Sequence, residues 1–174
     1  MRSFLKFPCL LAVFFVLSGC ATRTPSLVTF AAEGGVTQYF FPMMEWKGDK
    51  KEIGAVCDIT YRYQRGSQGV YNISFNYTGK TDKGKVPSVP AALSLDGDGT
   101  AYPLSDIERL FANTENSTTR ISSRIKGDDF LSLIRARSIT LIAAIDGTEY
   151  RFTPPKQFLE YRDKFLTDIA VQDF

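Results

Sequence analysis

The chain has 174 residues, with 21 Lys and Arg against 19 Asp and Glu and no histidine. This near balance of charge gives no electrostatic basis for binding nucleic acid or another polyanion. The absence of histidine excludes His-dependent catalytic triads and Cys/His zinc sites within the chain. The length is ordinary for one domain that buries its own core without a disulfide framework.

The first residues have the layout of a secretion signal. Arg2 and Lys6 precede an apolar run at residues 7–17, which is short for a membrane-spanning helix, and the box Leu17-Ser18-Gly19-Cys20 follows. This box resembles the signal of bacterial lipoproteins. The resemblance implies a signal peptide at residues 1–19, cleavage before Cys20, diacylation of its sulfur and acylation of the new amino group. An ordinary cleaved signal with an incidental cysteine is the alternative.

Ala21 follows the predicted lipid site. In lipoproteins an Asp at this position retains the chain at the inner membrane, so the resemblance favours the outer membrane in a cell that has two. Loss of Arg2 and Lys6 with the signal leaves 19 basic and 19 acidic residues. Residues 20–26 are expected to form a short lipidated tether, and residues 27–174 a single globular, sheet-rich domain.

The first expected elements are strands. Residues 27–32 read as a strand, with a turn at Gly34-Gly35. The run at residues 39–46 is apolar on both alternating faces and contains Pro42. It is expected to be a strand covered on both sides, or an edge strand with a kink at the proline.

A hairpin is the clearest local prediction. Apolar and polar residues alternate strictly along 57–63 and again along 71–77, and the segment between them carries two glycines. The pattern predicts two antiparallel strands with an aromatic face inward. Cys57 lies on that inward face and has no partner once Cys9 leaves with the signal and Cys20 carries lipid. A buried, inert thiol is therefore favoured over a reactive one.

The second half of the chain alternates strands and short helices. Residues 79–90 are rich in Gly, Lys and Pro and are expected to form an exposed loop. Residues 92–95 and 100–104 flank Asp96-Gly97-Asp98-Gly99 as a hairpin. The capping-box match Ser105-Asp106-Ile107-Glu108 predicts a helix that starts at Ser105.

The last third continues this alternation. Residues 120–125 are expected to be a strand, and Asp128 to cap a short helix. A buried strand at 139–145, a tight turn at Asp146-Gly147 and a return strand follow. Pro154 and Pro155 precede a final helix whose apolar stripe consists of Phe158, Tyr161, Phe165 and Ile169.

These elements indicate an α+β domain that is mainly antiparallel sheet, with two to three short helices, the last at the C-terminus. A β-sandwich is one arrangement that fits this composition. The order of elements in the last third resembles the end of the invasion-associated locus B family of exported bacterial proteins. That family tends to carry a cysteine pair that this chain lacks, so the resemblance transfers no residue and no activity.

Four motifs suggest chemistry but have simpler interpretations. Asp96-Gly97-Asp98-Gly99 resembles the start of a calcium loop, yet the place of the acidic twelfth ligand is Ile107, so a hairpin turn is favoured. Ser67 lies between glycines without a histidine to activate it. Asp128-Asp129 fits a helix start better than a carboxylate pair for glycoside hydrolysis. Three matches to the glycosylation sequon carry little weight behind a bacterial signal; they begin at Asn72, Asn76 and Asn116.

The sequence therefore predicts no catalytic, cofactor or metal residue and one modified residue, Cys20. The favoured function is a non-enzymatic envelope lipoprotein that is bound to the membrane by its lipid and binds or positions another envelope component. The alternative is a hydrolase that uses carboxylates alone, which would need two Asp or Glu side chains within about 10 Å of each other.

Overall fold

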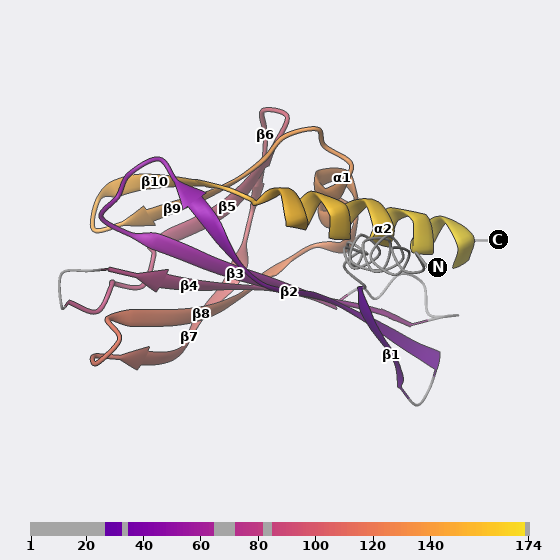
Figure 1. Cartoon of the computed structure of the whole chain (residues 1–174), viewed down its shortest axis with the longest axis horizontal. Coiled ribbons are helices and arrows are strands. Elements are labelled where there is room, and N and C mark those ends of the chain that lie inside the picture. Colours follow the sequence, from indigo (N-terminus) through magenta and orange to yellow (C-terminus); the bar gives the residue numbers. More distant parts are fainter. Residues whose placement is uncertain (1–26, 33–34, 65–71, 82–84, 173–174) are drawn as a thin grey trace, which may run out of the picture.

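The computed structural model describes residues 27–32, 35–64, 72–81 and 85–172. Within them, ten strands form one antiparallel sheet in the order β6-β5-β9-β10-β2-β3-β4-β8-β7, and β1 pairs with β2 beside this path (Figure 1). The strands are β1 (Val28–Ala32), β2 (Val36–Gly48), β3 (Gly54–Gln64), β4 (Asn72–Lys80), β5 (Ala92–Gly97), β6 (Thr100–Pro103), β7 (Ser105–Asn113), β8 (Thr118–Ile125), β9 (Ile139–Ile145) and β10 (Thr148–Thr153).

The sheet curls around its own core, and the two described helices lie on the inner side. These helices are α1 (Gly127–Ile134) and α2 (Lys156–Gln172), and α2 lies along the sheet in Figure 1. The expected antiparallel, sheet-dominated class with a C-terminal helix is confirmed. The sandwich is not what is observed, because the strands form one continuous curled sheet instead of two stacked ones.

Strand β2 runs through the middle of the sheet and changes its partner halfway along. Its first part pairs with β1 and its last residues pair with β10, while β3 follows it on the other side. The ladder with β3 breaks between Phe41 and Met44, which leaves Pro42 and Met43 as a bulge. A proline has no N–H to donate, so a bulge is where an interior strand tolerates it. Pro42 thus interrupts the pairing as a bulge, but β2 is neither an edge strand nor covered on both sides. One face is buried, with Tyr39, Phe41 and Trp46, whereas Met43 is 63% exposed.

The hairpins predicted from alternation and turn residues are present. Strands β3 and β4 pair in register from Gly54–Lys80 to Arg62–Asn72, and the loop between them, residues 65–71, lies outside the described residues. Strands β5 and β6 meet at Asp98 and Gly99, and β9 and β10 meet at Asp146 and Gly147. All four turn residues have positive φ, as a tight two-residue turn requires.

Two predictions in the second half are wrong. Residues 105–113 form strand β7 and not a helix, because antiparallel pairing with β8 outweighs the local capping signal, and Asp106 has a φ of 51° that a helix cannot accommodate. Helix α1 begins at Gly127 with Lys126 as its N-cap, and no side chain caps it. Asp128 therefore lies in the first turn, where a negative charge favours the helix dipole but does not cap it.

The core is built from aromatic rings of the inner sheet face and of both helices. Phe165 of α2 contacts several of them edge-on or at a tilt, with ring centroids 4.9–5.9 Å apart: Tyr39, Phe41, Tyr61 and Phe130. The predicted stripe of α2 is confirmed, since Phe158, Tyr161 and Phe165 are buried and Ile169 packs against the core. No helix among the described residues is long and apolar enough to cross a membrane.

The single tryptophan reports on this core. Trp46 is 2% exposed, and its ring lies 5.3 Å from that of Phe158 in α2. We expect blue-shifted emission that iodide quenches poorly in the native protein, because the indole is shielded from water. Replacing Phe158 with Ala should increase iodide quenching, whereas replacing its half-buried neighbour Leu159 should change it little. Emission typical of a water-exposed indole in the native protein would contradict this packing.

Candidate functional site

Some of the predicted site residues lie outside the described residues. They include Cys20, the predicted lipid site, and Ser67 of the glycine-flanked loop. The lipid prediction therefore remains a prediction. In the described part of the chain, no three Asp, Glu, Cys or His residues lie together in a group that could hold a metal ion.

The carboxylates of the Asp96-to-Gly99 turn serve as local hydrogen-bond acceptors. The Gly99 N–H donates to Asp96 Oδ1 at 3.1 Å. Asp98 accepts the N–H groups of Arg137 and Ser138, each at 2.9 Å, and the Ser138 hydroxyl at 3.0 Å. These donors, first of all the Arg137 N–H, lower the pKa of Asp98 below its ordinary value. The motif thus joins a hairpin turn to the segment before β9, which confirms the turn interpretation.

Asp128 and Asp129 both lie in the first turn of α1. The side chain of Asp128 is exposed and that of Asp129 is half-buried. Adjacent residues on a helix point about 100° apart, so their carboxylates diverge instead of flanking one substrate bond. Their position supports the structural interpretation.

Cys57 is a free thiol inside the sheet. It is 1% exposed and lies directly across from Tyr77 in the β3–β4 ladder. Burial raises the pKa of Cys57 well above its ordinary value, and the Asp58 charge adds to this while Arg120 opposes it. Burial likewise raises the pKa of Tyr77, whose hydroxyl has no hydrogen-bond partner among the described residues. Both groups are therefore held neutral, and the predicted inert thiol is confirmed as buried.

The buried Cys57 thiol should make the protein less stable in mild alkali. A group with a raised folded pKa contributes stability that is present below its unfolded pKa, about 8.5 for Cys, and is lost as the pH rises above it. Between pH 8.5 and 9.5 the native protein should lose roughly 1 kcal/mol more unfolding free energy than Cys57→Val, which cannot titrate. Urea unfolding at the two pH values measures this. Equal losses of unfolding free energy in the two proteins would contradict this prediction, because they would show that Cys57 ionises as readily in the folded protein as in the unfolded one.

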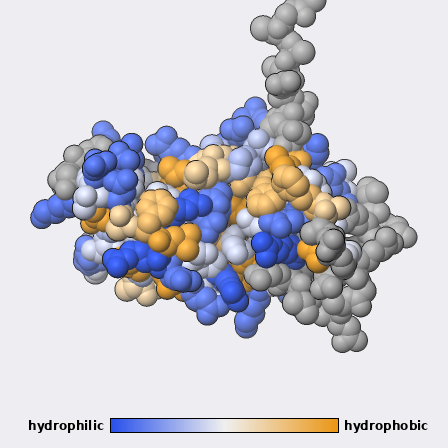
Figure 2. Space-filling model, turned by 90° about the horizontal axis from the view of Figure 1, so that it is seen from below, coloured by the Kyte–Doolittle hydropathy of each residue, from blue (hydrophilic) through white to orange (hydrophobic). Residues whose placement is uncertain are grey.

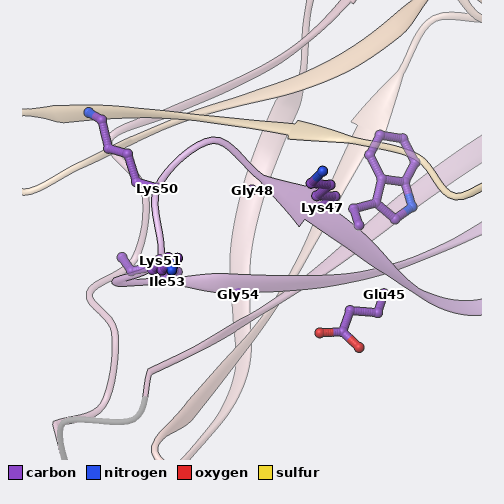
Figure 3. A pocket seen from close by; sticks show the side chains of 8 residues that line it. Glu45, Lys47, Gly48, Lys50, Lys51, Ile53 and Gly54 are labelled. Carbon is purple, nitrogen blue, oxygen red and sulfur yellow. The ribbon is translucent and has the colours of Figure 1, made fainter.

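A hollow on the surface lies at the turn between β2 and β3. It has a volume of about 580 Å³, and we call it the turn hollow; its lining comprises Glu45, Trp46, Lys47, Gly48, Lys50, Lys51, Ile53 and Gly54 (Figure 3). Gly48 is required there, because a Cβ at this position would come 2.9 Å from the Lys50 carbonyl oxygen and 3.2 Å from the Phe152 ring.

Strand β10 fixes the β2–β3 turn in place. Lys50 donates from Nζ to the Glu149 carbonyl oxygen at 2.7 Å, and its ammonium lies 5.1 Å from the centre of the Tyr150 ring. The Arg151 N–H donates to Asp49 Oδ1 at 3.0 Å, and the Asp49 N–H donates back to the Arg151 carbonyl oxygen. The lysine positions around the hollow therefore rest on a rigid turn.

The lysines of the turn hollow spread apart and do not converge. Figure 3 shows Lys47 near the end of β2, and Lys50 and Lys51 on the far part of the turn. Lys47 and Lys51 are exposed and make no ion pair within the described residues. Diverging surface ammonium groups do not form a closed ligand site, and the exposed carboxylates of Glu45, Asp49 and Glu52 in the same turn offset their charge.

A smaller hollow, of about 230 Å³, lies between Ile53 and the turn of β9 and β10. Its lining includes two carboxylates, Glu52 and Asp146, and the Ser88 hydroxyl donates to Asp146 at 3.0 Å. Both carboxylate side chains are exposed. A catalytic acid needs an environment that holds its proton near neutral pH, usually burial, and water around both groups works against that.

Sequence reasoning missed a polar cluster on the outer face of the sheet. Arg120 of β8 pairs with Asp58 of β3 at 2.8 Å and also donates to Thr78 at 3.1 Å. The Asn76 amide donates to the other Asp58 oxygen at 2.7 Å. Both charged side chains are less than one-fifth exposed. The alternation in the predicted hairpin indicated that Asp58 and Asn76 point outward, but nothing in the sequence indicated that β3, β4 and β8 are neighbours.

Comparison of the chain with the known protein families, with curated proteins and with solved structures finds no match. The resemblance of the last third to the invasion-associated locus B family therefore stays a prediction.

Proposed function

We propose that this protein is a membrane-anchored lipoprotein of the bacterial envelope that has no enzymatic activity and binds or positions another envelope component. The observation that carries the proposal is the box Leu17-Ser18-Gly19-Cys20 after an apolar run and a basic start. Two or three acyl chains on Cys20 exceed what stable anchoring requires, at about 0.8 kcal/mol per buried CH₂. Ala21 favours the outer membrane in a cell with two membranes.

The arrangement of the body suits a protein held at its N-terminal end. Strand β1, the first described element, lies at one end of the long axis, and the β2–β3 turn lies at the other (Figure 1). An anchor that precedes β1 would leave the turn hollow facing away from the membrane. The exposed charged side chains of this turn, Lys47 and Lys51 among them, are then available to a component beyond the membrane surface.

Hydrolysis by carboxylates alone remains the second candidate, and one observation favours a place for it. Glu52 and Asp146 line the same small hollow although they come from different turns. If this hollow were a hydrolytic site, Glu52→Gln and Asp146→Asn would each abolish the activity and leave stability nearly unchanged. The exposure of both carboxylates makes binding the better supported function.

Replacing Cys20 with Ser tests the anchoring. A hydroxyl cannot accept the thioether-linked lipid, so we expect the precursor to remain uncleaved and to carry no acyl label when cells are fed a labelled fatty acid. Replacing Cys9 with Ser is the matched control, because that cysteine lies inside the signal and should leave processing unchanged. A Cys20→Ser protein that is still cleaved and still membrane-bound would overturn the proposal.

A further inference from the structure

Strand β1 presents apolar side chains to the outside of the sheet. Val28 is 47% exposed and Phe30 is 56% exposed. Val28 lies opposite Phe40 in the β1–β2 ladder, and the Phe30 ring meets the Phe40 ring edge-on at 5.5 Å. We call these three residues the β1 face. Apolar residues also gather in patches among hydrophilic ones on the side of the molecule seen in Figure 2. Exposed apolar clusters of this kind usually mark a contact surface.

Among the described strands, the outer edge of β1 lacks the protection that the edge strands β6 and β7 have. Strand β7 has two register shifts and carries charged side chains, and β6 has only four residues and ends at Pro103. Strand β1 has the sequence VTFAA, without a charge, a proline or a break in register. An apolar edge of this kind invites aggregation unless something covers it.

The position of the β1 face in the chain indicates what covers it. Val28 follows Cys20 by eight positions. A chain spans at most about 3.6 Å per residue, so eight residues keep Val28 within roughly 29 Å of the acylated residue. Another exposed apolar pair, Leu110 and Phe111, lies near the end of β7, at the opposite end of the molecule from β1 (Figure 1). The β1 face is thus the one that the anchor holds close to lipid.

The charges around the β1 face match a membrane surface. Phe30 pairs with Gln38, and Gln38 pairs with the exposed Arg62 in the next strand, so these side chains share one row on the outer face. The Arg62 Nε donates to the Gln38 side-chain oxygen at 3.2 Å. No acidic residue occurs in the described residues 28–32, 36–41 and 59–64 of these three strands. An apolar patch flanked by arginine suits an interface with anionic headgroups.

We infer that the β1 face docks on the lipid surface that carries the anchor, with Val28, Phe30 and Phe40 in the headgroup region and Arg62 at its rim. This inference rests on the proposed anchoring at Cys20. Docking would orient the body on the membrane and direct the turn hollow away from it.

Position-specific fluorescence on the full lipidated chain tests this docking. Phe30→Cys and, as the matched control, Phe111→Cys place a thiol at similarly exposed sites on opposite ends, and the buried Cys57 should not react. Each protein carries an environment-sensitive dye and is reconstituted in vesicles of equal phosphatidylcholine and phosphatidylglycerol with a nitroxide on some headgroups. We expect the label at position 30 to be quenched severalfold more strongly than that at position 111. Val28→Cys provides a second site in case Phe30→Cys fails to fold.

Flotation of the same vesicles separates the two proposals. If the chain floats with the vesicles and the two labels are quenched equally, docking is overturned while anchoring stands. If the chain does not float, both proposals fail. If the label at position 30 stays exposed to water on vesicles but is shielded in intact cells, a protein partner covers the β1 face, which also overturns docking to lipid.

Discussion

Replacing Phe165 with Ala should lower the free energy of unfolding by about 3–5 kcal/mol, the usual cost of removing a fully buried aromatic ring. Phe165 is fully buried and lies where α2 meets the curled sheet. Its ring contacts those of Tyr39 and Phe41 in β2, Tyr61 in β3 and Phe130 in α1. Its removal leaves a cavity bounded by several elements, so no single side chain can move to fill it.

Leu166 provides the matched control for this substitution. It is the next residue of α2 and packs only partly against the core. Leu166→Ala should therefore cost clearly less than Phe165→Ala. Urea titrations followed by circular dichroism would compare the midpoints at equal slope. Equal losses in the two variants would mean that α2 stabilises the protein only by covering the sheet. The contacts between the Phe165 ring and its aromatic neighbours would then add no specific stabilisation.

The sequence predicted the parts of this fold whose signals are local. The alternation in β3 and β4 required no knowledge of distant residues, because period-two patterning and one buried face define a strand by themselves. The turns at Asp98-Gly99 and Asp146-Gly147 were equally clear, since both need positive φ. The stripe of α2 followed from the spacing of Phe158, Tyr161 and Phe165.

The features that depend on distant partners were not predictable in this way. Residues 105–108 match a capping box, but β8 pairs with Ser105–Asn113 along most of its length, with two register shifts. A paired strand satisfies more backbone groups than a short exposed helix. Pro42 signalled a kink, yet its place in an interior strand depends on β1 and β10, which flank β2 on either side of the bulge. The order of the strands in the sheet therefore determines both the strand at residues 105–113 and the interior position of Pro42.

The same division applies to the candidate functional residues. Cys20 was singled out because a lipoprotein signal is a contiguous pattern. The turn hollow and the β1 face are assembled from residues that become neighbours only after folding. Taken singly in the sequence, residues such as Lys47 and Phe30 carry no pattern that indicates a function. The pairing of β1 with β2 brings the residues of the β1 face together, and the docking of the β2–β3 turn on β10 positions those of the turn hollow.

Replacing Arg120 with Met should lower the free energy of unfolding by about 2 kcal/mol, as expected for the loss of hydrogen bonds to a charged group. The methionine keeps much of the packing of the arginine stem, so the main effect is on Asp58. That carboxylate would lose its 2.8 Å partner while it remains only 15% exposed, and Asn76 alone cannot neutralise its charge. Urea unfolding at neutral pH measures the loss.

A double-mutant cycle distinguishes an effect of this ion pair from an effect of packing. Asp58→Asn removes the charge and keeps the shape, so Arg120→Met combined with Asp58→Asn should cost less than the sum of the single changes. The exposed pair Arg151–Glu149 is the control: it is as short, at 2.7 Å, but both side chains are more than half exposed, and Glu149→Gln should cost only about 0.2–1 kcal/mol. Additive losses at Asp58 and Arg120 would show that the two charges do not interact. A coupling larger than that of the exposed pair would show that partial burial on the outer face, and not the distance between the charges, gives this cluster its strength.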